Sequence, residues 1–224
     1  DGFMWMTNYG QISSYFRGVI QDMNEKFKVP KGTFIIDLVF DNDGILWLNT
    51  NRGLGKYKND SLIIYDESDG LVKSSMGDIN VGKNNEIIYS THGYGFSIYD
   101  GESFKNFNES NGLIDNRIWD LAVDSKNNYW LALDGGGVAM FDGEKFHNHK
   151  ISDGLTAGET YSAYVDDFDN IWIGTFGGGV CYYDGKVWNS VDTRDGLLNN
   201  LVGVICSVDG NKYWFGSMDG ITSY

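Results

Sequence analysis

A repeat of about 42 residues runs through the chain and constrains its fold more than any other feature. Trp or Tyr occupies one equivalent position in six successive units, at residues 5, 47, 89, 130, 172 and 214. The dipeptide Gly-Leu begins at residues 70, 112, 154 and 196, and Asp-Gly begins at residues 100, 142 and 184. Three markers in phase indicate a tandem array of one supersecondary unit, in which each copy packs on its neighbours.

Each repeat is predicted to contain four short strands. In the best-defined copy the expected strands are residues 117–124, 129–133, 137–141 and 145–150. Asp142-Gly143, before the last of them, is a two-residue hairpin signal. Four strands at a period near 40 residues are typical of the blades of a β-propeller. Helical repeats are excluded because Gly-containing turns interrupt every run of about ten residues.

The predicted fold is therefore all-β, a single propeller domain over residues 1–224 that represents six blades. The expected blades are residues 1–32, 33–74, 75–115, 116–157, 158–199 and 200–224. Because residues 1–5 align with residues 43–47, the first blade is expected to lack its first strand and the last blade its fourth. A fragment of a longer propeller is the favoured interpretation, and a six-bladed ring with incomplete blades is the alternative.

The charge and composition of the chain exclude several classes of binding partner. Asp and Glu number 31 against 17 Lys and Arg, which gives a net charge of −14. Nucleic acid and anionic membranes attract basic proteins, so neither is expected as a partner of this segment. Aromatic residues make up 15% of the chain, which argues against disorder. Cys181 and Cys206 lack metal-type pairing and are expected to be buried thiols, and no cofactor is expected.

Two patterns resemble metal sites, but a structural role is predicted for both. His147 and His149 lie on one face of an outer strand, where exposed polar side chains are expected, and a third ligand is missing. Residues 41–44 and 166–170 resemble calcium loops but lack the bidentate Glu of an EF-hand. Asp and Asn are favoured in such turns for local reasons, so no metal site is predicted.

The motifs of the repeat resemble those of a known family. The best copies are Asp195-Gly196-Leu197-Leu198-Asn199-Asn200, Ile171-Trp172-Ile173-Gly174-Thr175 and Asp184-Gly185-Lys186-Val187-Trp188. Together they resemble the two-component regulator propeller repeat, which is found in the sensor parts of membrane-bound hybrid histidine kinases. The resemblance implies a periplasmic or extracellular ectodomain that takes part in signal transduction and often recognises oligosaccharides. Any kinase activity would reside elsewhere in a parent protein, and the resemblance transfers no catalytic residue.

The candidate ligand-binding residues lie in loops expected on one face of a propeller, between the second and third strands and between successive blades. Loops on a rigid scaffold commonly carry binding residues. The predicted residues are Arg52, His92, Tyr94, Arg117, Asp134, Tyr161, Phe176, Asn200 and Met218. Tyr94, Tyr161 and Phe176 are expected to stack on a sugar ring, and the charged residues and His92 to form hydrogen bonds. The competing interpretation is that these are ordinary solvated loop residues.

Three functions remain open from the sequence. The favoured one is a sensor module that binds a small molecule or an oligosaccharide. The second is an enzyme, because streptogramin lyase is also a propeller, with His92 as the imaginable centre. The third is an interaction scaffold that forms a homodimer through blade edges. A deep pocket would favour the enzyme, an aromatic-lined loop face the sensor, and a flat apolar patch the scaffold.

Overall fold

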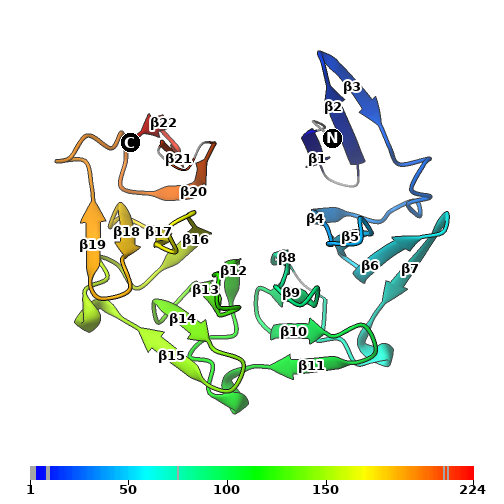
Figure 1. The fold of residues 1–224 in the computed structure, drawn as a ribbon, viewed down its shortest axis with the longest axis horizontal. Helices are drawn as coiled ribbons and strands as arrows, with labels where there is room; N and C mark the ends of the chain where they lie inside the picture. Colours follow the sequence, from blue (N-terminus) through cyan, green and yellow to red (C-terminus); the bar gives the residue numbers. More distant parts are fainter. Residues whose placement is uncertain (1–3, 9–10, 75, 209, 211) are drawn as a thin grey trace. The chain divides into compact units, whose positions relative to one another are not determined.

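The computed structural model describes residues 4–8, 11–74, 76–208, 210 and 212–224. Its strands form six antiparallel sheets that are the blades of a β-propeller, which confirms the predicted fold class (Figure 1). The residues group into two compact units, 1–106 and 107–224. Among the described residues, no helix is long and apolar enough to cross a membrane.

The first unit contains three sheets. The first is three-stranded: β1 (Met4–Asn8), β2 (Gln11–Phe16) and β3 (Val19–Asp22). The second is β4 (Ile35–Phe40), β5 (Leu46–Thr50), β6 (Gly53–Lys58) and β7 (Ser61–Tyr65). The third is β8 (Ile79–Val81), β9 (Ile87–Thr91), β10 (Gly95–Tyr99) and β11 (Phe104–Phe107), which ends at the unit boundary.

The second unit also contains three sheets. They are β12 (Ile118–Val123), β13 (Tyr129–Leu133), β14 (Val138–Phe141) and β15 (Phe146–His149); β16 (Thr160–Val165), β17 (Ile171–Thr175), β18 (Val180–Tyr183) and β19 (Trp188–Val191); and β20 (Val202–Ser207), β21 (Tyr213–Ser217) and β22 (Gly220–Ser223). The first strands of successive blades are neighbours, since β16 contacts both β12 and β20.

The recurring Gly-Leu dipeptide ends a short helical turn between blades. The turns are the 3₁₀ helices η1 (Glu67–Asp69), η2 (Glu109–Asn111) and η3 (Ile151–Asp153). Each is followed by a glycine in the left-handed region, with φ between 97° and 113°, a conformation that glycine adopts without strain. The leucines that follow these glycines are buried, so the dipeptide reverses the chain and anchors the connection in the core.

The recurring Trp fills the junction between one blade and the next. Trp47, Trp130 and Trp172 are each less than 5% exposed and pack against strands of the following blade. Each indole nitrogen also donates a hydrogen bond to the Asp that immediately follows the preceding strand. The Nε1–Oδ2 distances are 2.8 Å to Asp41, 3.1 Å to Asp124 and 2.9 Å to Asp166.

Those hydrogen bonds explain the turns that resemble calcium loops. Asp166 accepts from the backbone N–H groups of Phe168 and Asn170 and from the side chains of Asn170, Trp172 and Tyr213. Both carboxylate oxygens are therefore occupied by protein donors. No group of three or more His, Cys, Asp or Glu that could hold a metal ion occurs among the described residues.

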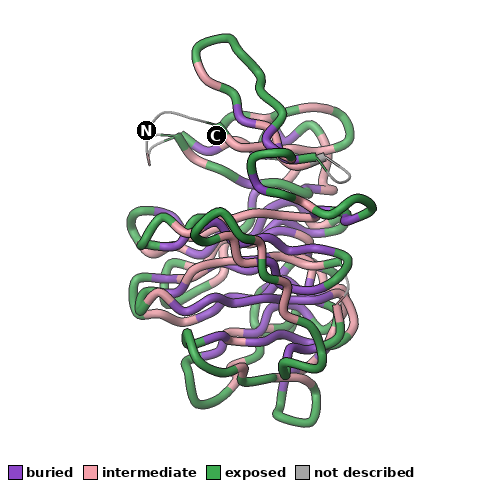
Figure 2. Tube along the Cα trace, turned by 90° about the vertical axis from the view of Figure 1, so that its right-hand side faces the viewer, coloured by how far each residue is buried: buried purple, intermediate pink, exposed green. Residues whose placement is uncertain are grey.

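Burial follows the strands, and exposed residues gather in the turns (Figure 2). Cys181 is buried as expected, but the expectation is wrong for Cys206, which is exposed. Cys206 lies on β20, where Ile205 points into the core. Neighbouring side chains on a strand point to opposite faces, so Cys206 faces away from it.

Replacing Gly137 by alanine should lower the free energy of unfolding by about 3 kcal/mol. Gly137 has φ +92°, and an added Cβ would lie 2.2 Å from the carbonyl oxygen of His149. Left-handed strain amounts to roughly 1–2 kcal/mol, and displacing a backbone carbonyl adds to it. Urea denaturation measures the loss. Gly143→Ala is the matched control, because Gly143 has φ +94° with open space around it, and it should show the strain alone.

Candidate ligand-binding site

Four of the predicted site residues form one connected surface in the second unit. Arg117 immediately precedes β12, Asp134 follows β13, Tyr161 lies on β16, and Phe176 follows β17. They come from two neighbouring blades whose first strands are in contact. The four residues therefore lie at one end of these strands. The predicted loop position is wrong for Tyr161, which is the second residue of β16. The role of all four in binding stays a prediction.

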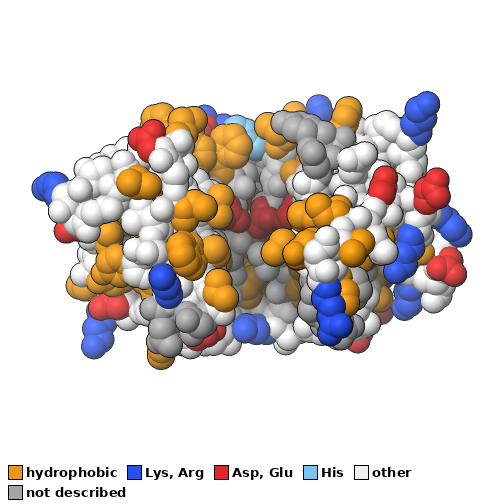
Figure 3. Space-filling model, turned by 90° about the horizontal axis from the view of Figure 1, so that it is seen from above, with side chains coloured by type: hydrophobic (Ala, Val, Ile, Leu, Met, Phe, Trp, Pro, Cys, Tyr) orange, Lys and Arg blue, Asp and Glu red, His pale blue; other side chains and the backbone are white. Residues whose placement is uncertain are grey.

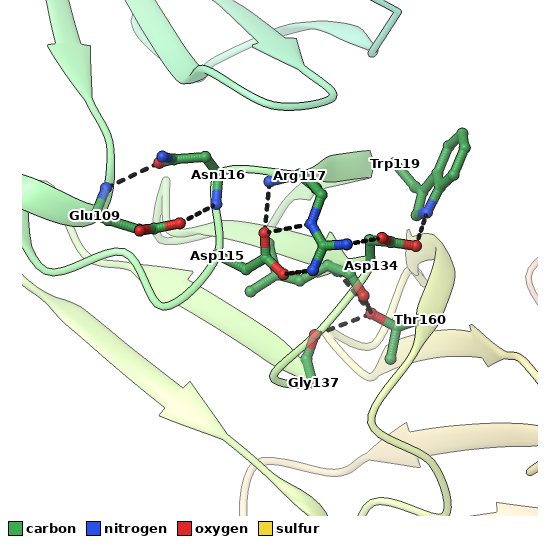
Figure 4. Close-up of polar contacts among 9 residues, drawn as sticks. Glu109, Asp115, Asn116, Arg117, Trp119, Asp134, Gly137 and Thr160 are labelled. Atoms are coloured by element: carbon green, nitrogen blue, oxygen red, sulfur yellow. Dashed lines mark hydrogen bonds and ion pairs between the residues drawn. The ribbon is translucent and has the colours of Figure 1, made fainter.

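Arg117 is held between two carboxylates (Figure 4). Asp115 accepts hydrogen bonds from Nε (3.0 Å) and from a terminal nitrogen (2.6 Å), and Asp134 accepts from the other terminal nitrogen (2.5 Å). Hydrogen bonding and the charge of Asp115 raise the pKa of Arg117, so it is always a cation. The side chain is 49% exposed and the three groups carry a net charge of −1, which disfavours an anionic ligand.

Hydrogen bonds that no sequence motif predicts stabilise the loops around this ion pair. Glu109 and Asn116 bond reciprocally, each side chain to the other's backbone N–H, at 3.2 and 2.9 Å (Figure 4). The hydroxyl of Thr160 is buried and bridges the backbone of Leu133 and Gly137 across the blade junction. The scaffold is fixed before a ligand arrives, which reduces the entropy lost on binding.

Trp119 connects the charged groups to an aromatic row. Its indole nitrogen donates to Oδ1 of Asp134 at 3.1 Å (Figure 4), and its ring lies 5.3 Å from that of Tyr161. The ring of Tyr161 lies 5.7 Å from that of Phe176. We call Trp119, Tyr161 and Phe176 the aromatic row. Phe176 is 49% exposed, so the row ends at the surface.

Trp119 is the member of the site that the sequence analysis missed. It lies one repeat before Tyr161, since 161 − 119 is 42, and both are the second residue of the first strand of a blade. The equivalent repeat position could have identified Trp119 from the sequence. The contact of Trp119 with Asp134 could not have been predicted, because the two residues meet only when β12 and β13 pair.

The other two predicted residues of the second unit have different surroundings. Asn200 has a structural role: its side chain accepts the N–H of Thr193, and its carbonyl accepts from Gly177 and Gly179. Met218 is 84% exposed on the last blade. It belongs to a set of exposed apolar side chains of this unit that also includes Phe176, Leu198, Val204 and Ile221. Hydrophobic side chains reach the surface on the face drawn in Figure 3.

The predicted residues of the first unit lie in turns after the second strands of two blades and contact the connection that precedes each blade. Arg52 donates to the carbonyl of Lys31 at 3.4 Å. The backbone N–H of His92 donates to the carbonyl of Met76, and the His92 side chain is half-buried. Tyr94 is 43% exposed, with the ammonium of Lys73 5.2 Å from its ring centre. Their role in binding stays a prediction.

The two histidines of β15 have structural partners. His147 Nε2 lies 2.7 Å from Asp142 Oδ2, and hydrogen bonds from Lys145 and His147 hold the pKa of Asp142 well below its usual range. His149 lies among the rings of Trp130, Tyr183 and Trp188, and burial lowers its pKa. The two imidazoles therefore face different neighbours instead of converging on one ion.

Comparisons with known proteins support the architecture. No protein-family model matches the chain, and no curated protein matches it. Among solved structures, the extracellular domain of BT3049, assigned to a hybrid two-component system of B. thetaiotaomicron, superposes with a TM-score of 0.85 at 22% identity, over 100% of this chain and 32% of that one. The chain shares this propeller fold. It spans about a third of the BT3049 domain, and the likeness agrees with the resemblance seen in the repeat motifs.

Two other propellers show how widely the fold is used. PorZ, a surface component of the type-IX secretion system of Porphyromonas gingivalis, matches with a TM-score of 0.74 at 14% identity, over 100% of this chain and 37% of that one. Virginiamycin B lyase from Staphylococcus aureus matches with a TM-score of 0.72 at 15% identity, over 98% and 79%. At these identities the likeness shows the fold alone, because one propeller scaffold serves unrelated activities.

Proposed function

We propose that the chain is an extracytoplasmic sensor module of a two-component signalling protein, and that its second unit binds a neutral oligosaccharide. The similarity to the extracellular domain of BT3049 supports the sensor role. The aromatic row, which ends at the Arg117–Asp134 pair, is the observation that carries the choice of ligand.

The chemistry of the row suits a sugar. Aromatic rings offer rigid apolar surfaces against which the C–H faces of a pyranose pack, at a low cost in side-chain entropy. Asp134, which is more exposed than Asp115, is an acceptor for sugar hydroxyls, and the half-exposed Arg117 is a donor. The net negative charge of these three groups favours hydroxyl donors over a sugar carboxylate. The ligand class is therefore a neutral glycan fragment in preference to an acidic one.

A binding screen tests the proposal directly. The chain is titrated calorimetrically with a panel of neutral oligosaccharides and with acidic oligosaccharides of matched length. Saturable binding of at least one neutral compound, with weaker binding of acidic ones, is expected. If acidic oligosaccharides bind more tightly, or if none binds, the assignment of the ligand class is wrong.

Replacing Tyr161 by alanine should weaken binding of a bound oligosaccharide by about 10- to 100-fold, because the middle ring of the aromatic row is lost. The melting temperature should change little, since Tyr161 is only partly buried. Tyr15→Ala is the control, because Tyr15 is a 39% exposed tyrosine of the first unit outside every predicted site. Equal affinity of the Tyr161 variant and the wild type would place the ligand elsewhere.

A further inference from the structure

A second candidate site lies at the other end of the strands that carry the aromatic row. Arg117 precedes β12, whereas Asp124 follows it. Beside Asp124, between the blades β12–β15 and β16–β19, is a cavity of about 310 Å³. Its walls include Trp130, Met140, His149 and Tyr183. We call it the interblade cavity.

An equivalent junction in the first unit shows what chemistry these walls accept. Trp47 is the repeat counterpart of Trp130, and Tyr99 that of Tyr183. The residue paired with Trp47 across the sheet is Lys56. Its ammonium lies 4.6 Å from the ring centre of Trp47 and 5.7 Å from that of Tyr99. This junction is therefore closed by a cation on two aromatic rings.

The interblade cavity has the same rings without the cation. The residue paired with Trp130 is Met140, which carries no charge. Trp130 and Tyr183 nevertheless keep their relation, with ring centres 5.9 Å apart. In the next junction the equivalent position holds Tyr182, whose ring stacks on Trp172 at 4.7 Å. Of these three junctions, the one with Met140 has neither a cation nor a ring at the position paired with the Trp. Its aromatic walls include the ring of His149, which stacks on Trp130 from β15 with ring centres 5.4 Å apart.

The charges around the interblade cavity favour a cation. Asp124 and Asp169 both line it, against one lysine, Lys126, and the imidazole of His147, which pairs with Asp142. Asp124 accepts hydrogen bonds from the indole of Trp130 and from the backbone and side chain of Asn128, which hold its carboxylate in place. Asp169 is fixed by the backbone N–H and the hydroxyl of Ser125. An anion would meet two immobile carboxylates.

The imidazole of His149 also lines the cavity, and one of its ring nitrogens lacks a hydrogen-bond partner among the described residues. Its Nδ1 accepts the indole N–H of Trp188 at 3.3 Å, so the proton of the neutral ring is assigned to Nε2. Nε2 is buried and has no hydrogen-bond partner among the described residues. An oxygen acceptor on a bound molecule would supply the missing partner.

We propose that the interblade cavity binds a small organic cation with an alkylammonium head, which takes the place relative to the two rings that the ammonium group of Lys56 takes in the first unit. The head lies against Trp130 and Tyr183, with the carboxylates of Asp124 and Asp169 as counter-charges. A hydroxyl on the ligand suits His149. The site is separate from the aromatic row, so either proposal stands if the other fails.

The first test compares two molecules of the same shape. The whole chain is titrated with choline and with 3,3-dimethylbutan-1-ol, in which carbon replaces the quaternary nitrogen. Choline should bind with at least about 10-fold higher affinity, because only it gains the cation–π attraction. Equal binding of the two would show an apolar cavity only and would overturn the proposal, as would the absence of choline binding.

Replacing Met140 by lysine supplies the cation within the chain. The variant copies the cross-strand pair of Trp47 and Lys56, so it should fold, and it should weaken choline binding at least about 10-fold. Met140→Leu is the uncharged control and should keep binding choline. Tyr183→Leu is the alternative test if Met140→Lys does not fold. It removes one aromatic wall of the cavity and should also weaken choline binding. Undiminished choline binding by either the folded Met140→Lys variant or Tyr183→Leu would overturn the proposal.

Discussion

Replacing Asp166 by alanine should lower the free energy of unfolding by about 4 kcal/mol. Its side chain accepts buried hydrogen bonds from the indole of Trp172 (2.9 Å) and the hydroxyl of Tyr213 (2.7 Å). It also accepts two backbone N–H groups within its turn. Each buried donor left without an acceptor costs about 1–3 kcal/mol, so losing several together is among the most damaging changes a surface turn can undergo.

Urea denaturation at neutral pH measures this loss. Asp167→Ala is the matched control, because Asp167 is the exposed neighbour in the same turn, and it should change stability by no more than about 0.5 kcal/mol. Asp166→Asn should fall between the two, since the amide keeps one acceptor oxygen. Similar stabilities for the Asp166 and Asp167 variants would contradict the structural role assigned to this hydrogen-bond hub.

The pH dependence of the same variants gives a second readout. Burial alone would raise the pKa of Asp166, but hydrogen bonds from Trp172, Asn170 and Tyr213 outweigh burial and lower it. A carboxylate whose pKa is lower in the folded state stabilises the protein above its unfolded pKa, about 3.9, and loses that contribution as the pH falls through the folded value. The stability gap between wild type and Asp166→Asn should therefore narrow as the pH falls below about 4.

Replacing Trp172 by alanine should cost about 4 kcal/mol and should loosen the last blade first. The Trp172 ring contacts Tyr182 in its own blade and Tyr213, Phe215 and Tyr224 beyond β20, with ring centres 4.2 to 6.1 Å apart. Truncating a buried Trp typically costs about 3–5 kcal/mol, because contacts are lost and a cavity remains. The loss falls on one blade junction because a repeat protein is held together by contacts between neighbours.

Hydrogen exchange with mass spectrometry resolves where protection is lost in the Trp172 variant. Amides of β20 to β22 should exchange faster, whereas those of β12 to β15 should keep most of their protection. Trp214→Ala is the control, because Trp214 is half-buried and pairs with the ammonium of Lys212 at 4.7 Å. It should cost about 1 kcal/mol. Uniform loss of protection in both units would argue against blade-by-blade stability.

The repeat predicted the fold because each marker has a local physical cause. Gly-Leu recurs because a left-handed glycine ends the turn before each blade and the leucine is buried. Trp recurs because it fills the junction to the next blade, as at Trp47 and Trp130. Such requirements repeat with the geometry, so they appear in the sequence at a fixed spacing.

The repeat predicted only part of the candidate ligand-binding site. Loop positions of Arg117, Asp134 and Phe176 followed from the spacing, whereas Tyr161 lies on β16. The connection of these residues through Trp119 did not follow from it. Asn200 has an equivalent loop position, but its side chain accepts a hydrogen bond from the backbone N–H of Thr193 and so stabilises the loop. The connections of Trp119 join residues 15 and 42 positions apart in the chain, and no local pattern specifies such partners.

The sequence by itself determined the period, the all-β class and the four-strand plan of the complete blades, because backbone pairing and core burial obey local periodicity. Only the tertiary structure decided which side chains act together. Cross-strand pairing sets Met140 opposite Trp130 where Lys56 lies opposite Trp47, and blade packing brings Tyr161 to Trp119. Those pairs depend on register and on the stacking of blades, which act between segments distant in the chain.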